Sequence, residues 1–429
     1  MEPKPSAVNS PFAILNYRYY WAARFLAMLA GSAMMLIIGW QVYNIARETM
    51  SPAESAAQLG LVGLIQFVPL FALTPVTGWI ADRLDRRLIT RLTLAAQLAC
   101  AALLGWLTYT DAVNLPALFG VAVVLGVARA FAGPAFGALA PNLVPAELLP
   151  KAIALSSIAW QVGMIIGPAL GGLLHDREPF APYALSAVLF AVAIVAMLLI
   201  TPVPRPAVDR VRHPIRQMID GLSYVRTNQL VLGAITLDLF AVFLAGSTAL
   251  LPIYARDILQ VGSHGLGQLS AAPAVGAALT ALLFSFRPLK SGVGAKMFGA
   301  VVVFGIATII FGLSRSMPLS LVCLFVVGSA DMFSVYVRQS LIQLHTPDAM
   351  RGRVGAVSQL TISASNELGD AESGFLAAAI GPVAAVVAGG IGAIAITLLW
   401  ARLFPQLRLA RSFEPPNLDE GQRPKETAT

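Results

Sequence analysis

Long apolar runs alternate with short polar connections along most of the chain. About 20 consecutive apolar residues let an α-helix cross the roughly 30 Å of hydrocarbon in a bilayer. Twelve runs reach that length, so the pattern predicts an all-α membrane protein with twelve transmembrane helices. The predicted spans are Tyr20–Ile45, Ala56–Ala81, Leu88–Tyr109, Leu115–Leu139, Lys151–Leu174, Ala181–Ile200, Leu230–Tyr254, Leu266–Phe286, Ala295–Leu313, Pro318–Leu344, Val354–Leu376 and Pro382–Leu403.

The connection between the second and third spans sets the orientation. Gly78–Arg91 reads GWIADRLDRRLITR and carries four arginines, and short loops rich in Lys and Arg stay in the cytoplasm. With the predicted spans, 22 of the 29 Lys and Arg residues lie on that side, four on the other and three within spans. Twelve spans then place both termini in the cytoplasm.

Composition supports this interpretation. The chain is 57% hydrophobic and 12% charged, with a mean hydropathy of +0.75. The net charge of +7 alternates loop by loop, as topology requires, so we expect no nucleic-acid partner. Cys100 and Cys323 fall within spans and are expected to be free thiols, and Met1–Tyr19 lacks the features of a signal peptide.

The longest connection, Thr201–Gln229, divides the chain into two halves of six spans. Ile215, Met218, Ile219, Leu222 and Val225 recur in it at helical spacing, which predicts an amphipathic helix on the cytoplasmic leaflet or simply a linker helix. The predicted domains are a cytoplasmic tail over 1–19, a six-helix bundle over 20–200, the linker over 201–229, a second six-helix bundle over 230–403 and a disordered tail over 404–429.

The two halves also resemble each other. At an offset of 202 residues, Gly126, Ala128, Pro145, Ser156, Gly167 and Gly172 fall on Gly328, Ala330, Pro347, Ser358, Gly369 and Gly374. Parallel repeats of this kind are a recognised transporter design, with sites near the midplane where the repeats meet. The fold class is therefore two pseudo-symmetric six-helix bundles.

Charged residues inside spans are costly and should face protein or water. The first half has Arg24 and Arg129, whereas the acids all lie in the second half. In the register of the repeat, Arg129 falls on Asp331 and Pro168 falls on Asp370. The acids within spans are Asp238, Asp331, Glu367, Asp370 and Glu372.

With these residues the chain resembles the major facilitator superfamily over Phe12–Leu403. GWIADRLDRR resembles that family's loop signature G-x-L-A-D-R-x-G-R-R, with Asp85 where the family usually has glycine. The resemblance implies that the loop is a charge latch between the halves, although a turn that only sets topology would look the same. It also implies a proton-coupling role for Arg129. The predicted latch residues are Gly78, Asp82, Arg83, Arg86 and Arg87.

The fifth span carries GMIIGPALGG, which matches the signature G-x-x-x-G-P-x-x-G-G of drug:proton antiporters. Glycines four residues apart make a flat stripe for close helix packing, and a proline lets the helix bend. The stripe suits a rocking interface but also ordinary small-residue packing. Its residues are Gly163, Gly167, Pro168, Gly171 and Gly172. ASNELGDAESG and TPDAMRGR, at 364–374 and 346–353, resemble the branch containing bacterial enterobactin exporters and macrolide-efflux proteins.

The sequence has neither a phosphate-binding GxxxxGK[ST] loop nor an HExxH pair, so we expect no enzyme, metal site or cofactor, and energy from a proton gradient. Asp331, with Arg129 as partner, is the first candidate for proton coupling, followed by Glu367 and Asp370, which share a helix face. Asp238 and Arg24 are expected to snorkel or cap helix ends. Arg338 could serve the cavity or reach the interface, and Glu372 could be exposed to water.

Aromatic and polar residues of the presumed cavity helices are the guide to the substrate. They suit a bulky, partly hydrophobic ligand, although any one of them could simply pack. The candidates are Trp40, Gln41, Tyr43, Trp160, Gln161, Tyr336 and Gln339.

The sequence thus predicts a monomeric, proton-coupled exporter of a small amphipathic molecule, a drug or siderophore, in the bilayer of a bacterial inner membrane. Uptake or lysophospholipid transport by the same fold is one alternative. A receptor or scaffold that does not transport is another, although costly buried charges argue against it.

Overall fold

Helices make up almost all of the computed structural model, which describes residues 10–201, 214–289 and 291–413. Within these ranges the side chains of residues 75, 78, 79, 81–83, 214–217, 348 and 349 are not described. The first half contains α1 (Leu15–Thr49), α2 (Pro52–Arg83), α3 (Arg86–Tyr109), α4 (Leu115–Leu139), α5 (Leu149–Arg177) and α6 (Ala181–Leu199). The short 3₁₀ turns here are η1 (Pro11–Ala13), η2 (Ala140–Asn142) and η3 (Ala146–Leu148).

The second half follows α7 (Pro214–Thr227). It contains α8 (Gln229–Leu244), the 3₁₀ turn η4 (Ser247–Leu250), α9 (Leu251–Ile253), the π-helical turn η5 (Tyr254–Ile258), α10 (Gly262–Phe286), α11 (Val293–Leu313), α12 (Met317–Leu344), α13 (Asp348–Ile380), α14 (Pro382–Leu403) and α15 (Pro405–Arg408).

Eleven helical segments of the described chain are long and apolar enough to cross a membrane. The remaining predicted span, the eleventh in order (Val354–Leu376), lies within α13, a 33-residue helix that contains three of the five acidic residues predicted within spans. At 1.5 Å per residue α13 is about 50 Å long, ample for a bilayer. The helical membrane fold is confirmed, and α13 differs from the other spans by its acids.

Local sequence explains where several helices begin. Ser51 and Glu54 form a reciprocal capping box at the start of α2, with Pro52 in the first turn. Asn114 and Asn228 cap α4 and α8 by accepting a hydrogen bond from the backbone N–H three residues later. These caps turn the chain back at the membrane boundary, as the polar connections predict.

The seventh predicted span, Leu230–Tyr254, is wrong as a single helix. α8 ends at Leu244, and the chain continues through η4, α9 and η5. The break lies where Gly246 meets α13: a Cβ at Gly246 would be 2.6 Å from the carbonyl oxygen of Gly369. A tertiary contact, rather than a local breaker, interrupts this apolar run.

Both predicted tails also need correction. η1 and α1 begin at Pro11 and Leu15, inside the region assigned to the N-terminal tail. At the other end, α15 follows α14, and the backbone carbonyl of Ala410 accepts a hydrogen bond from the N–H of Gly294 at 3.0 Å. Residues 404–413 are therefore ordered, and residues 414–429 lie outside the described chain.

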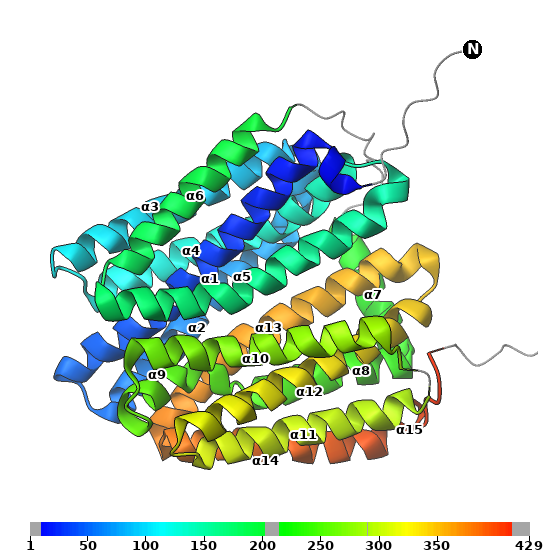
Figure 1. The fold of residues 1–429 in the computed structure, drawn as a ribbon. Coiled ribbons are helices and arrows are strands. Elements are labelled where there is room, and N and C mark those ends of the chain that lie inside the picture. The colour runs from blue at the N-terminus through cyan, green and yellow to red at the C-terminus, as the bar shows by residue number, and fades with distance from the viewer. Residues whose placement is uncertain (1–9, 202–213, 290, 414–429) are drawn as a thin grey trace, which may run out of the picture.

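Figure 1 shows the halves as two layers, α1–α6 above and α8–α14 below. We call the end where α1 begins and α15 lies the basal end, and the opposite end, where α1 meets α2, the distal end. Across the layers α2 packs on α13 and α5 packs on α10. α7 lies at the basal end against α13, with Val225 buried while Ile219 and Leu222 remain exposed.

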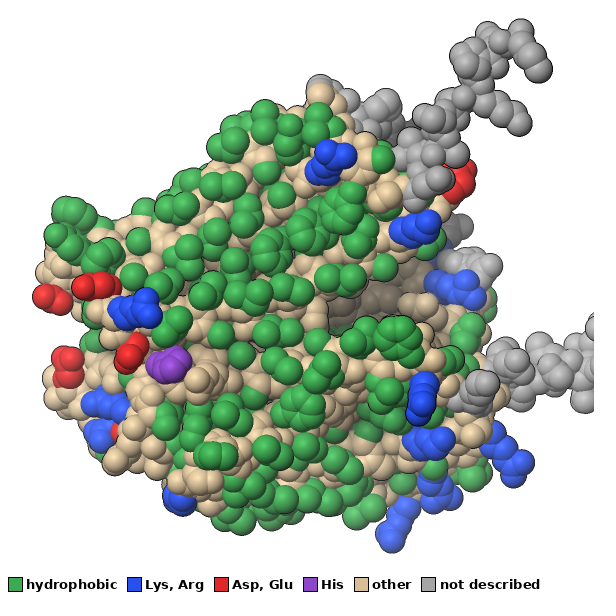
Figure 2. Space-filling model, viewed as in Figure 1, with side chains coloured by type: hydrophobic (Ala, Val, Ile, Leu, Met, Phe, Trp, Pro, Cys, Tyr) green, Lys and Arg blue, Asp and Glu red, His purple; other side chains and the backbone are tan. Residues whose placement is uncertain are grey.

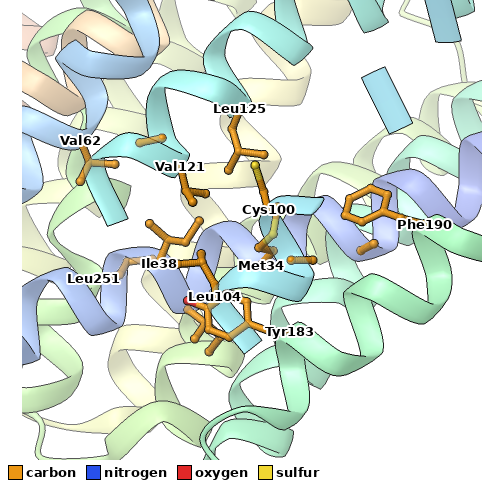
Figure 3. Close-up of a cluster of buried hydrophobic side chains, with 14 of the residues drawn as sticks. Met34, Ile38, Val62, Cys100, Leu104, Val121, Leu125, Tyr183, Phe190 and Leu251 are labelled. Atoms are coloured by element: carbon orange, nitrogen blue, oxygen red, sulfur yellow. The ribbon is translucent and has the colours of Figure 1, made fainter. Parts of the chain in front are cut away.

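The buried core joins the halves only toward the distal end. Figure 3 shows part of it, with Leu251 of the second half beside Ile38 of α1 among side chains of the first half. A separate basal cluster, which includes Val231, Val337 and Leu407, contains residues of α7 and the second half and none of the first half. The hydrophobic contact between the halves therefore belongs to the distal part of the molecule.

Candidate functional site

Two equivalent glycine contacts close the distal part of the interface. On one side Gly172 of α5 meets Gly267 of α10, and a Cβ at Gly267 would lie 2.6 Å from the carbonyl oxygen of Pro168. On the other side Gly374 of α13 meets Gly60 of α2. Gly172 and Gly374 are partners in the 202-residue register, so the repeat found in the sequence is present in the fold.

A further pair of contacts repeats within the halves. Gly126 of α4 packs on Gln66 of α2, and its register partner Gly328 of α12 packs on Pro273 of α10. The two bundles thus share their internal packing as well as their mutual contacts. The predicted pseudo-symmetric architecture follows from both observations.

The glycine stripe of α5 packs mainly inside the first half. A Cβ at Gly163 would meet the Met28 side chain, and one at Gly171 would lie 3.0 Å from the carbonyl oxygen of Ala33 in α1. Gly167 meets the same helix, whereas Gly172 and Pro168 contact α10. The stripe therefore holds α1, and only its distal end reaches the other half.

Arg129 bridges the halves. Its Nη2 lies 2.8 Å from Oε1 of Glu367 on α13, and its Nη1 donates to Oε1 of Gln66 at 3.0 Å. The Arg129 side chain is 47% exposed although it projects from the middle of α4, whereas the Glu367 side chain is only 9% exposed. Since the guanidinium points at the second half, its exposed part faces the space between the halves.

Asp370 lies one turn beyond Glu367 toward the distal end. Its Cβ would be 3.2 Å from a Cβ at Gly63, so it faces α2, as Glu367 does. The predicted shared face of the two acids is present. The described residues give Arg129 one carboxylate partner and leave a second carboxylate close by.

The predicted pairing of Arg129 with Asp331 is wrong. Asp331 lines a small cavity inside the second half together with Asp238 of α8 and Ser334 of α12. Asp238 forms a buried ion pair with Arg338, with side-chain exposures of 7% and 3%, instead of snorkelling. Arg129 pairs with Glu367 at the interface, whereas Asp331 lies within the second half, so coincidence in the repeat does not imply contact.

A hollow opens between the halves at the basal end (Figure 2). On the basal side of the Gly60–Gly374 contact, the Arg129–Glu367 pair also joins the halves. On the other side the Nε2 of Gln161 donates to the carbonyl oxygen of Ala274 on α10 at 3.1 Å. Trp160, the neighbour of Gln161, is 42% exposed. Beyond this level the glycine contacts close the interface.

At the distal end, side chains of α1 and η5 form what we call the distal lock: Tyr43, Arg47, Arg256 and Asp257. The Tyr43 hydroxyl donates to Oδ2 of Asp257 at 2.5 Å, and Nε of Arg47 lies 3.5 Å from the same oxygen. Arg256 donates to the backbone oxygen of Asn44 at 3.3 Å and lies over the Tyr43 ring. The lock ties the halves together.

Sequence reasoning missed most of this lock. It placed Tyr43 in a substrate cavity, whereas the ring is buried at the distal interface. Arg47, Arg256 and Asp257 lie outside the predicted spans. The signal that could have found them is the scarcity of basic residues on that side, where only four occur.

Other predicted cavity residues have different surroundings. Gln41 is buried inside the first half, where it donates to Thr108 Oγ1 at 3.1 Å and accepts from the Tyr183 hydroxyl at 2.8 Å, so its assignment to the cavity is wrong. Tyr336 stacks on Phe284 with ring centroids 4.4 Å apart. Two further candidates are half-buried: Trp40 and Gln339.

The predicted latch lies at the turn between α2 and α3, which consists of two residues, Leu84 and Asp85. Arg86 donates to the carbonyl oxygen of Ala138 at 2.8 Å, and Arg87 pairs with Asp85, the cap of α3, at 2.7 Å. These contacts tie the turn to its own half, and a gating role stays a prediction. Three predicted latch residues have side chains outside the described set: Gly78, Asp82 and Arg83.

Two helical repeats that meet at one end and part at the other around buried charges are typical of membrane transporters. The described residues contain no group of three or more His, Cys, Asp or Glu side chains able to hold a metal. The sequence profile of the Major Facilitator Superfamily matches residues 20–369, and the chain belongs to that family.

Among curated proteins, the enterobactin exporter EntS of Shigella boydii serotype 18 (strain CDC 3083-94 / BS512) is 27% identical over 404 residues, covering 93% of this chain and 94% of that protein. EntS of Escherichia coli O139:H28 (strain E24377A / ETEC) gives the same identity and coverage. These relatives share the length of the chain as well as its family.

Solved structures agree on the fold. The nucleoside transporter NupG superposes with a TM-score of 0.73 at 12% identity, covering 91% of this chain and all of that one. A bacterial homologue of the human lysosomal transporter Spinster, inward-facing and unoccupied, gives 0.72 at 16% identity, with coverages of 94% and 99%. The family match and the curated relatives make the protein a membrane transporter and not an enzyme.

Proposed function

We propose that this transporter exports a small amphipathic molecule, a siderophore or drug, in exchange for protons. The observation that carries the proposal is the bridge between Arg129 and Glu367, which joins the halves on the basal side of the Gly60–Gly374 contact, with Asp370 one turn away. Export of a siderophore is supported by the enterobactin exporters among the relatives. The apolar helices around the hollow suit an amphipathic ligand.

Charge balance explains how this site couples to protons. Two carboxylates and one guanidinium carry a surplus negative charge in a membrane protein interior, where an uncompensated charge is costly. A proton shared by Glu367 and Asp370 balances it. Protonation of Glu367 also weakens its attraction to Arg129, and this bridge is one of the contacts that hold the halves together.

Orientation follows from the positive-inside rule. η1, α15 and the arginine-rich turn before α3 lie at the basal end, which we assign to the cytoplasm of a bacterial inner membrane. The hollow then opens inward, and the distal lock closes the outer side. A substrate would enter from the cytoplasm and leave after the distal contacts separate.

The test uses purified protein in liposomes with an imposed pH gradient and a panel of catecholate siderophores, macrolides and lipophilic dyes. We expect wild type to move a panel member against its gradient. Glu367→Gln should abolish this uphill movement while keeping downhill exchange, because the variant can no longer alternate between charged and neutral forms.

Asp331→Asn is the matched control, since that acid lies in the separate cavity of the second half. Uphill transport lost in Asp331→Asn but kept in Glu367→Gln would move the proton site to Asp331. Wild type that moves no panel member under any gradient would refute the export of these compounds.

A further inference from the structure

A cavity of about 470 Å³ adjoins the distal lock, outside the hollow and the coupling site. Residues of both halves line it: α1 contributes one wall, η5 the opposite wall, and the start of α14 closes one side. Its lining includes Tyr43, Arg47, Arg256, Asp257, Gln260 and Pro382.

Two guanidinium groups share one carboxylate in this cavity. Nε of Arg47 lies 3.5 Å from Oδ2 of Asp257, and Nε of Arg256 lies 3.8 Å from Oδ1. Asp257 also accepts the hydrogen bond of Tyr43. The lining therefore carries one positive charge that its own carboxylate does not balance.

The remaining hydrogen bonds of the two arginines are long and few. Arg47 donates to the backbone oxygen of Met50 at 3.4 Å, and Arg256 donates to that of Asn44 at 3.3 Å. Each guanidinium has five N–H donors, so most are left for another acceptor. The buried Nε of Arg47 has no hydrogen-bond partner among the described residues.

Nearby acids do not supply that acceptor. Glu54 accepts hydrogen bonds at 2.8 Å from both the N–H and the hydroxyl of Ser51, which hold it in the cap of α2. Glu48 is exposed and is not part of the cavity lining. Only four Lys or Arg residues lie in the predicted connections on this side of the membrane, and two of them line this cavity.

We propose that this cavity binds a small oxyanion, a phosphate or carboxylate group, between Arg47 and Arg256. The planar guanidinium group of arginine can donate two parallel hydrogen bonds to the oxygens of a carboxylate or phosphate group. Because Arg47 belongs to the first half and Arg256 to the second, a bound anion strengthens the distal lock. It therefore stabilises the state that is closed at the distal end, and it does so independently of proton coupling.

The test measures the distance between the basal ends of α5 and α10. Glu147 and Arg287 are exposed there on opposite halves, so Glu147→Cys and Arg287→Cys with spin labels report the opening of the hollow. Inorganic phosphate is titrated at constant ionic strength, with chloride as the control salt. At ten times its Kd, phosphate should shift the equilibrium toward the long basal distance about tenfold.

Three variants separate a binding site from a simple lock. Asp257→Asn removes the internal carboxylate, so the basal distance should shorten and phosphate should restore it. Arg256→Gln should shorten the distance with no rescue, and Arg47→Gln should repeat this from the other wall. Arg315→Gln, an exposed arginine at the same end but outside the cavity, should respond to phosphate as wild type does.

A second experiment, with anionic lipid in place of free phosphate, identifies the source of the anion. If nanodiscs of phosphatidylglycerol lengthen the basal distance without free phosphate, and phosphatidylcholine does not, the headgroup is the natural ligand and the site stands. A wild type that ignores both phosphate and anionic lipid overturns the proposal. An equal phosphate response in the Arg256→Gln and Arg47→Gln variants also overturns it, because the effect is then one of salt.

Discussion

Alanine at Gly267 should drive the transporter out of the state described above. Its Cβ would lie 2.6 Å from the carbonyl oxygen of Pro168, short of the 3.4 Å at which ordinary contact begins by about 0.8 Å. The Cα atoms of Ala169 and Gly172 would both be 3.3 Å away. These neighbours are backbone or Cα atoms, so no flexible side chain can move aside and α5 must shift from α10.

Overpacking of this kind costs about 1–3 kcal/mol. The cost falls on the distal-closed state, because opening the distal end separates α5 from α10 there. An energy difference of 1–3 kcal/mol changes the ratio of two states about 5- to 150-fold. Gly60→Ala should act in the same way, since its Cβ would lie 2.8 Å from the carbonyl oxygen of Ala371 in the equivalent contact.

Spin-label distances between positions 147 and 287 measure this ratio directly. The basal distance should shorten in Gly267→Ala and in Gly60→Ala. Gly299→Ala is the matched control, because nothing lies within 4 Å of a Cβ at that glycine. A basal distance distribution in Gly267→Ala that matches wild type, with the protein folded, would refute the reasoning that these glycines set the closed distal interface.

Three smaller predictions concern stability and reactivity. Asp238→Asn removes one member of the buried Asp238–Arg338 pair and should cost about 3–5 kcal/mol of stability. The double variant Asp238→Asn with Arg338→Gln should recover part of this loss. Thermal unfolding in detergent measures both effects. Gln41→Leu should lower thermal stability by about 1–3 kcal/mol through the unpaired Tyr183 and Thr108, and leave substrate affinity in a binding assay unchanged. Cys100 and Cys323, each 5% exposed, should resist a membrane-impermeant maleimide in native protein and react after denaturation, as mass spectrometry can check.

The sequence predicted the helices well because hydropathy and length decide them. It failed at the break after Leu244, since Ala245 and Gly246 are weak local signals and the cause is the close approach of Gly369. It also failed at the basal tail, where Leu407 is buried against the second half although the surrounding segment is polar. Both errors come from tertiary contacts between residues far apart in the chain, which local sequence patterns do not report.

The functional site shows a second limit of prediction from sequence. The repeat register correctly placed Gly172 and Gly374 in equivalent contacts, whereas Arg129 and Asp331, which also coincide in it, have different partners. The error was to treat equivalence as contact. Two positions related by the pseudo-two-fold axis touch only if they lie close to that axis, and a sequence does not give that distance.

Glu367 reaches Arg129 because α13 crosses α2 at the glycine contacts. Gly60 and Gly63 let the backbone of α13 approach α2, which brings Glu367 within reach of Arg129, itself bonded to Gln66 of α2. The same crossing closes the distal interface. Steric closure and the ion pair therefore depend on one helix contact, so a shift that separates α2 from α13 must also stretch the Arg129–Glu367 bridge. In the proposed mechanism, a change of charge at Glu367 therefore acts on the same helix contact that closes the distal interface.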